Sequence, residues 1–356
     1  MTTIWDPYDM GPIHLKHRLA LAPMTRSRAN ADGTPGPLAA DYYRQRAGLG
    51  LLITEGAQPS DDGQGYLNTP GIYTDAHVEG WKAVADAVHE EGARLIIQLM
   101  HVGRMSHPDN TPHHRQPVAP SAIAPGVPMF TATGMQDIPV PRSLGTDEIA
   151  LTVDDFRQAA LAAVAAGADG VEIHGANGYL LHQFLAPNAN ARDDWYGGSI
   201  ENRSRLTLQV ATAVADAIGP ERTGIRLSPG ATIGGLDEGP ESDDLYRHLV
   251  AELAQLDLLY LHLFHFSSEA LLEDLRALWP GTLLVIRSGR QVEQLGDDVA
   301  RGLADLAPVG VAALANPDLV DRLSSGAPLN TPDPSTFYGG GAAGYTDYPT
   351  AASVNT

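Results

Sequence analysis

The sequence predicts an α/β fold, a (β/α)₈ TIM barrel, because short strand-like runs alternate with helix-like runs and the chain has the length of one large barrel. The expected strands are short and mostly apolar, as strands covered on both faces should be. They are Leu19–Ala22, Leu51–Glu55, Arg94–Leu99, Gly170–His174, Gly224–Leu227, Leu258–Leu263, Leu283–Ile286 and Leu306–Val309. An open doubly wound sheet is the alternative, but no Gly-x-Gly-x-x-Gly follows the first strand.

Helices are expected between these strands. Their ranges are Asp75–Glu91, Asp154–Ala166, Ser199–Ile218, Ser242–Leu256, Ser268–Leu278 and Val292–Leu303. In the second of them, Phe156, Ala159 and Ala163 lie on one apolar stripe. We expect Thr152 with Asp155 to cap the start of this helix, and Gly167 to end it.

Two segments depart from the simple repeat. Residues 103–145 follow the third strand and are rich in Pro, His and Ser, so we expect a capping excursion over the barrel mouth. Residues 330–356 are rich in Pro, Gly and Tyr and predict a tail laid across the protein rather than a helix. No linker divides the chain, so residues 1–356 are expected to form a single barrel domain.

Composition excludes several classes of function. The net charge of −20 argues against nucleic acid and anionic membranes as partners. There is no cysteine, which excludes disulfides and thiol nucleophiles. The N-terminus lacks the pattern of a signal peptide and no apolar run approaches about 18 residues, so a cytoplasmic location and no membrane span are expected. His101, His107, His113 and His114 lack a ligand spacing, so no metal site is expected.

Polar residues follow several expected strands. His174, Asn177 and Tyr179 come at the end of the fourth strand, and Thr25, Gln98 and Arg226 belong to the ends of the first, third and fifth. Since the carboxyl ends of barrel strands share one face, these groups should meet at the mouth. No pair of carboxylates is placed for glycoside chemistry. Donors with one phenol suit a flat heteroaromatic cofactor and a carbonyl oxygen.

Several of these motifs resemble the old yellow enzyme family of flavin-dependent ene-reductases. The likeness is carried by Pro23-Met24-Thr25-Arg26, Asp41–Ala47, Ile53–Gly56, Val171–Arg205, Gly224–Pro229, Asn316–Leu319 and Gly344–Pro349. The resemblance implies a barrel that binds FMN in its mouth, takes a hydride from NADPH or NADH, and reduces the C=C bond of α,β-unsaturated carbonyl compounds. The expected partner is therefore a small molecule, and the chain should act as a monomer or a homodimer.

The resemblance also implies residue roles. His174 and Asn177 would hydrogen-bond the substrate carbonyl oxygen, and Tyr179 would donate the proton to the α-carbon. Thr25, Gln98 and Arg226 would hydrogen-bond the flavin. The other expected contacts are Gly56 beside the ring, Gly289, Arg290 and Gly310 in the phosphate turns, and Met100 and Tyr345 in the substrate pocket.

One departure from the family pattern leaves two alternatives open. Val311 stands where the phosphate-binding arginine is expected, and a valine cannot donate a hydrogen bond. Either Arg287 or Arg290 from the neighbouring turn replaces it, and FMN still binds. Or FMN binding is weakened or lost, and His174, Asn177 and Tyr179 serve non-redox acid/base chemistry or ligand binding.

Overall fold

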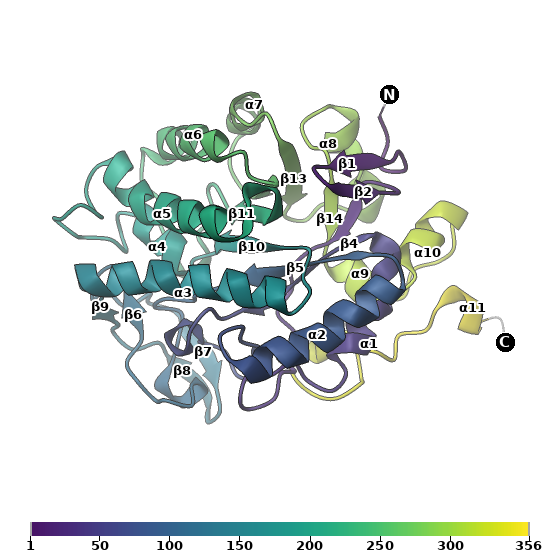
Figure 1. Cartoon of the computed structure of the whole chain (residues 1–356), viewed down its shortest axis with the longest axis horizontal. Coiled ribbons are helices and arrows are strands. Elements are labelled where there is room, and N and C mark those ends of the chain that lie inside the picture. The colour runs from purple at the N-terminus through teal and green to yellow at the C-terminus, as the bar shows by residue number, and fades with distance from the viewer. Residues whose placement is uncertain (1, 355–356) are drawn as a thin grey trace.

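The computed structural model describes residues 2–354, and its centre is a barrel of parallel strands (Figure 1). The strands are β3 (Leu19–Leu21), β4 (Leu51–Ala57), β5 (Arg94–Leu99), β10 (Gly170–Gly175), β11 (Thr223–Leu227), β12 (Tyr260–His265), β13 (Thr282–Arg287) and β14 (Ala307–Val309). They form one sheet in the order β13-β12-β11-β10-β5-β4-β3-β14, and a parallel bridge between Leu284 and Leu306 closes it. The expected barrel and its eight strands are confirmed.

Helices surround this sheet (Figure 1). The longer ones are α2 (Asp75–Glu90), α3 (Thr146–Ala165), α5 (Ile200–Ile218), α6 (Ser242–Leu253) and α7 (Glu269–Leu278). The shorter ones are α1 (Ala39–Arg44), α4 (Leu180–Leu185), α8 (Asp297–Ala300), α9 (Val311–Ala315), α10 (Leu319–Ser325) and α11 (Ala351–Val354). The helix expected over Val292–Leu303 is wrong as a continuous element, because a single 3₁₀ turn at Val292–Gln294 precedes the short α8.

The start of α3 also differs from the expectation. It begins at Thr146, eight residues before Asp154, and the Gly145 N–H donates to the Glu148 carboxylate at 2.8 Å. The expected cap of Thr152 with Asp155 is therefore wrong. Thr152 lies inside the helix, where its hydroxyl donates to the Glu148 carbonyl oxygen. Gly167 follows the helix with a φ of 91°, as expected for a helix that ends on glycine.

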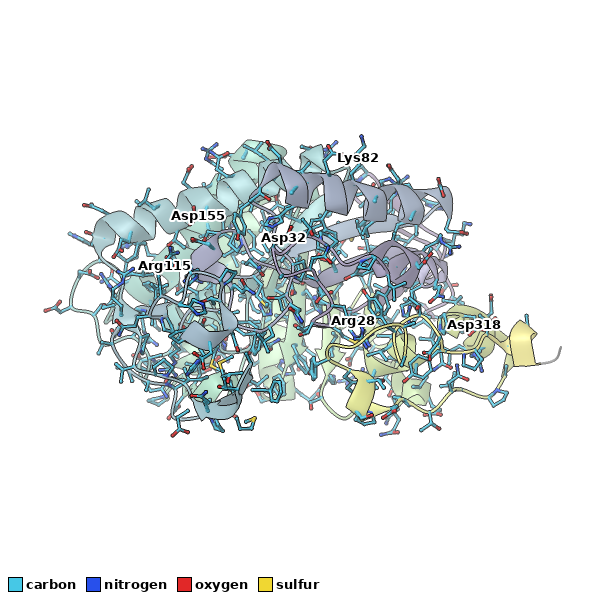
Figure 2. All side chains as sticks on the ribbon, turned by 90° about the horizontal axis from the view of Figure 1, so that it is seen from below. Arg28, Asp32, Lys82, Arg115, Asp155 and Asp318 are labelled. Atoms are coloured by element: carbon cyan, nitrogen blue, oxygen red, sulfur yellow. The ribbon has the colours of Figure 1, made fainter. Side chains whose placement is uncertain are left out.

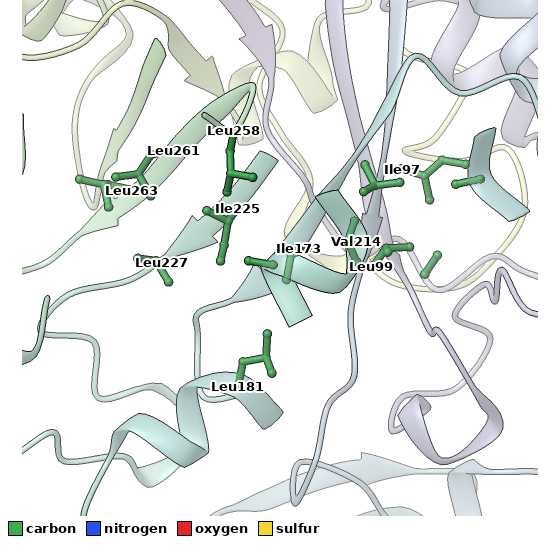
Figure 3. Packing of buried hydrophobic residues seen from close by; sticks show 14 of the residues in the cluster. Ile97, Leu99, Ile173, Leu181, Val214, Ile225, Leu227, Leu258, Leu261 and Leu263 are labelled. Atoms are coloured by element: carbon green, nitrogen blue, oxygen red, sulfur yellow. The ribbon is translucent and has the colours of Figure 1, made fainter. Parts of the chain in front are cut away.

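The barrel interior changes character along its axis. At the lower end, a hairpin of β1 (Tyr8–Met10) and β2 (Ile13–Leu15) packs its apolar side chains against Ala20, Leu51 and Ile96. Toward the carboxyl ends of the strands the buried residues become polar, with Gln98, Glu172, His174, Arg226 and His262 all below 6% exposed. The outward side chains of β5, β10, β11 and β12 pack against the helices (Figure 3). The buried polar side chains of the barrel interior therefore gather toward the carboxyl ends of the strands.

Two segments lie outside the repeat. Between β5 and α3 the chain forms the strand pairs β6 (Val118–Ala119) with β9 (Arg142–Ser143) and β7 (Pro128–Thr131) with β8 (Gly134–Asp137). The β7–β8 hairpin contributes side chains to a cavity at the mouth. The C-terminal segment runs along the other side of the molecule, where Arg28 donates to the carbonyl oxygens of Thr336, Gly341 and Ala343 (Figures 1 and 2).

Candidate active site

His174 ends β10 as a buried, neutral imidazole. The Ala176 N–H donates to its Nδ1 at 3.2 Å. Burial, followed by the positive charge of Arg226, holds the pKa of His174 well below its ordinary value. Because Nδ1 accepts a hydrogen bond in a neutral ring, the proton lies on Nε2. His174 can therefore donate from Nε2, which has no partner among the described residues.

Asn177 follows in a left-handed backbone conformation, with a φ of 55°. Its N–H donates to the Ser228 hydroxyl at 2.8 Å, which ties the loop after β10 to the loop after β11. The side-chain Oδ1 is buried and has no hydrogen-bond partner. Because buried polar atoms normally have partners, this amide has the character of a group that binds a ligand.

Tyr179 packs its ring edge against His174, with centroids 4.9 Å apart and planes at 85°. Its hydroxyl donates to the hydroxyl of Tyr66 at 3.2 Å. Burial raises the pKa of Tyr179 well above its ordinary value, so the phenol stays protonated at neutral pH. His174, Asn177 and Tyr179 thus come together as one group of neutral side chains.

Arg226 lies beside His174 across the β10–β11 pairing. It is 5% exposed, its Nε is buried without a partner, and its guanidinium makes no hydrogen bond with any described residue. A buried guanidinium without an acceptor is costly, so this position favours an anionic or carbonyl-bearing ligand.

Glu172 lies on β10 two residues before His174, one layer deeper in the barrel. It was not among the site residues predicted from the sequence. It accepts hydrogen bonds from Gln98 at 2.7 Å, from Tyr260 at 3.0 Å and from His262 at 2.8 Å. Burial raises its pKa, but His262 and Arg226 more than offset this, so the net shift is downward and the carboxylate is ionised. The signal was present in the alternation of β10, since Glu172 and His174 both point inward while Ile173 points outward.

Two cavities of about 590 Å³ each lie at the mouth, one lined by Arg226 and the other by Tyr179, while His174 and Asn177 line neither. The first, which we call the cradle, is lined by Arg226 and by the turns after β13 and β14, including Gly289, Arg290 and Gly310. The second, which we call the outer pocket, is lined by Thr25, Tyr179 and the β7–β8 hairpin. Met24 lines the cradle and the next residue, Thr25, lines the outer pocket, so the segment that follows β3 lies between the two cavities.

The tyrosine expected in the substrate pocket is a different one. Tyr345 is 1% exposed and stacks on Tyr42, with ring centroids 4.3 Å apart, beneath the guanidinium of Arg28. The prediction that Tyr345 walls the pocket is therefore wrong, because its ring belongs to the packing of the tail. Tyr338 lines the outer pocket instead and is 69% exposed.

Gly56 and Met100 lie beneath the cavities rather than in their walls. A Cβ on Gly56 would lie 2.5 Å from the Met100 sulfur, so the missing side chain makes room for Met100. Met100 is 3% exposed and packs with Met105, Met129 and other apolar residues. Met105 and Met129 line the outer pocket, and Met100 packs directly behind them, so its role beside a substrate stays a prediction.

The far end of the cradle carries a cluster of paired charges. Arg287 donates to Asp298 from Nε at 2.8 Å and from Nη2 at 3.0 Å, and it also contacts Glu269. Arg290 donates to Asp298 from Nη1 at 2.6 Å. Val311 is 47% exposed at the start of α9. No sequence pattern pointed to Asp298, which meets the arginines only in the folded chain.

Two absences hold for residues 2–354. Over that range, no helix is long and apolar enough to cross a membrane. Among the same residues, no three His, Cys, Asp or Glu side chains gather closely enough to hold a metal ion.

Comparison with known proteins gives one family. The family model described as "NADH:flavin oxidoreductase / NADH oxidase family" matches residues 3–330. The chain is 42% identical to 12-oxophytodienoate reductase 2 of Arabidopsis thaliana, over 98% of this chain and 96% of the relative. It is 41% identical to a probable flavin mononucleotide-dependent alkene reductase of Leishmania infantum, over 96% of each chain.

Solved structures agree with this assignment. The structure of morphinone reductase superposes with a TM-score of 0.95 at 42% identity, covering 99% of this chain and 98% of the other. That of an old yellow enzyme homologue from Zymomonas mobilis superposes with a TM-score of 0.93 at 37% identity, covering 98% and 99%. The chain therefore belongs to the NADH:flavin oxidoreductase / NADH oxidase family, that of old yellow enzyme, and is an oxidoreductase.

Proposed function

We propose that the protein binds FMN and reduces the C=C bond of α,β-unsaturated carbonyl compounds with NADPH or NADH as hydride source. The observation that carries this proposal is the Arg226 guanidinium at the mouth, which is buried and makes no hydrogen bond with any described residue. FMN, when bound, would supply the hydride carrier between the nicotinamide and the alkene. Relatives named as alkene reductase and morphinone reductase support the same reaction class.

The residues of the cradle fit the chemistry of FMN. Arg226 can donate to the carbonyl edge of a flavin ring, and Thr25 lies in the segment between the cradle and the outer pocket. At the other end, Gly289 and Gly310 leave the backbone of both turns open, and Arg290 lines the same cavity. Arg290 uses one nitrogen on Asp298, which leaves other guanidinium donors for a phosphate.

We place the alkene in the outer pocket, which Tyr179 lines, with its carbonyl oxygen directed toward His174, whose ring packs against Tyr179, and toward the neighbouring Asn177. His174 Nε2 and Asn177 Nδ2 can both donate to a carbonyl oxygen, which polarises the double bond and stabilises negative charge as it develops. Tyr179 stays protonated and can give its proton to the α-carbon, with Tyr66 holding its hydroxyl. Met105, Met129 and Phe130 line the pocket with apolar surface. The non-redox alternative has no observation in its favour.

The deciding experiment is the absorbance spectrum of the purified protein, repeated after FMN has been added and the excess removed. Near-stoichiometric flavin is expected, followed by NADPH- or NADH-dependent reduction of an enone such as cyclohexenone. A folded protein that retains no flavin after reconstitution would contradict the proposal.

A further inference from the structure

A buried hydrogen bond from a histidine to a carboxylate joins the two loops that carry the mouth residues. His182 lies on α4, which follows the loop after β10, and Glu238 lies in the loop after β11. His182 Nε2 is 2.7 Å from Glu238 Oε1, and their side chains are 0% and 4% exposed. Neither residue lines the cradle or the outer pocket. Any influence on the reaction must therefore pass through other residues.

His182 reaches back to the loop that carries the mouth residues. The Gly178 N–H donates to His182 Nδ1 at 3.0 Å. Because Nδ1 accepts this bond, Nε2 carries a proton and donates to Glu238. Gly178 stands between Asn177 and Tyr179, so this bond, together with those from Asn177 N–H to Ser228 and from Gln183 to the Gly178 carbonyl oxygen, holds the backbone that orients both side chains.

The backbone at Asn177 and Gly178 has an uncommon conformation that contacts with other segments must stabilise. Asn177 and Gly178 have φ values of 55° and 84°, and two consecutive left-handed residues are uncommon. A Cβ on Gly178 would lie 2.3 Å from the Ile233 carbonyl oxygen, so the turn passes directly over the loop after β11. Such conformations persist only where the surrounding structure holds them.

Glu238 in turn is held by three further donors. The Tyr246 hydroxyl donates to Oε1 at 2.5 Å, while the Ser242 hydroxyl and the Gly230 N–H donate to Oε2 at 2.5 and 2.9 Å. Burial raises the pKa of Glu238, but His182 and the hydroxyls reverse the shift, so the carboxylate is ionised at neutral pH. Its oxygens are therefore fixed acceptors that set the position of His182.

We propose that Glu238 and His182 are positioning residues, which hold Asn177 and Tyr179 in reactive geometry through the Gly178 N–H. The role in catalysis rests on the proposed function, but the role in holding the loop does not. An ionised carboxylate that orients an imidazole, which in turn orients a working group, is an arrangement that proteins use elsewhere to fix geometry.

The first test is amide hydrogen exchange over residues 175–180 in the whole protein with Glu238→Gln. An uncharged amide has one acceptor oxygen in place of two, so whichever way it turns, the charge-assisted hydrogen bond from His182 is weakened or lost. We expect exchange at Gly178 to become about tenfold faster or more, as the loss of one buried hydrogen bond implies. Unchanged exchange would overturn the proposal.

Glu241→Gln is the matched control. Glu241 lies three residues away, pairs with Arg203 at 2.9 Å and has a side chain that is 63% exposed. It makes no contact with the loop of residues 175–180 among the described residues. Exchange in that loop should therefore match the wild type, and equal loosening by both variants would show only a general weakening.

His182→Gln gives a second test if Glu238→Gln does not fold. A glutamine amide can still donate to Glu238 but has no acceptor at the Nδ1 position, so only the Gly178 bond is lost. The same loop should loosen while β5 stays protected, and a loop as protected as in the wild type would refute the role.

The FMN-loaded protein separates the two proposals. With Glu238→Gln, phenol binding should weaken about tenfold while FMN affinity stays unchanged, because the cradle is untouched. If the wild type binds no FMN, the proposed function fails, but the exchange result still decides the positioning role. If FMN and phenol both bind as in the wild type, the positioning role fails alone.

Discussion

The two halves of the barrel mouth are built on different principles. The half that follows β10 and β11 is held by hydrogen bonds from backbone N–H groups to buried side chains, such as Asn177 to Ser228 and Gly178 to His182. The half that follows β13 and β14 is held by ion pairs among Arg287, Arg290 and Asp298. The first half presents donors with no partner, whereas in the second the charged groups already have partners.

Because only the second half has its charged groups already paired, a carbonyl oxygen and a phosphate meet different costs on binding. A carbonyl oxygen that meets His174 and Asn177 breaks no internal hydrogen bond, so the site is preorganised. A phosphate that meets Arg290 competes with Asp298 for the same guanidinium, so part of its attraction is offset by the contact it weakens. We therefore expect single substitutions to change activity more in the half that follows β10 and β11 than in the half that follows β13 and β14.

The largest expected effect belongs to Tyr179→Phe in the first half. Removing the proton donor should slow alkene reduction by roughly 10²- to 10⁴-fold, while reduction of the flavin by NADPH or NADH changes little. Stopped-flow kinetics of the two half-reactions would measure this. If both half-reactions slow equally, Tyr179 is not the proton donor.

In the second half, Asp298→Asn should reduce the free energy of unfolding by about 3 kcal/mol at pH 7, because Arg290 loses its counter-charge and Arg287 keeps only Glu269. Burial raises the pKa of Asp298, but the two arginines hold it below the ordinary value of 3.8. A lowered folded-state pKa stabilises the fold above the unfolded pKa, and this stability is lost as the pH falls.

The stability difference between wild type and Asp298→Asn should therefore shrink below about pH 4. Urea unfolding across pH 3–7 would measure it. The same variant should bind FMN more tightly, because Arg290 no longer has a competing carboxylate. If the variant were as stable as the wild type at pH 7, Asp298 would not stabilise the fold as a counter-charge.

His174→Ala should weaken the binding of phenols and enones by roughly tenfold to a hundredfold, as expected for the loss of one buried donor. Titration followed through the flavin spectrum would measure this, with FMN affinity as the internal control. Unchanged phenol affinity would mean that the oxygen binds elsewhere.

The smallest expected effect belongs to Arg290→Ala. FMN affinity should fall about tenfold, while riboflavin, which lacks the phosphate, should bind as before. Fluorescence titration with both flavins isolates the phosphate contribution. Equal losses for FMN and riboflavin would contradict phosphate binding by Arg290.

Each prediction from the sequence that proved wrong has a structural reason. Tyr345 was assigned to the substrate pocket from the family resemblance alone, and only the path of the aromatic tail decides that Tyr338 reaches the outer pocket. The start of α3 was misjudged because Gly145 has no side chain to mark a cap, and Glu148 supplies the bond instead.

The sequence by itself determined the barrel and the closeness of the three residues to which we assign the catalytic role. Eight short apolar strands that alternate with helices predict a closed (β/α)₈ barrel. His174, Asn177 and Tyr179 lie close together because they are close along the chain. The tertiary structure alone decided that Asp298 joins Arg287 and Arg290, and that Glu238 holds His182 across 56 residues. Contacts between distant segments leave no local periodicity, so only the packed chain reveals which charges meet and which donors remain free.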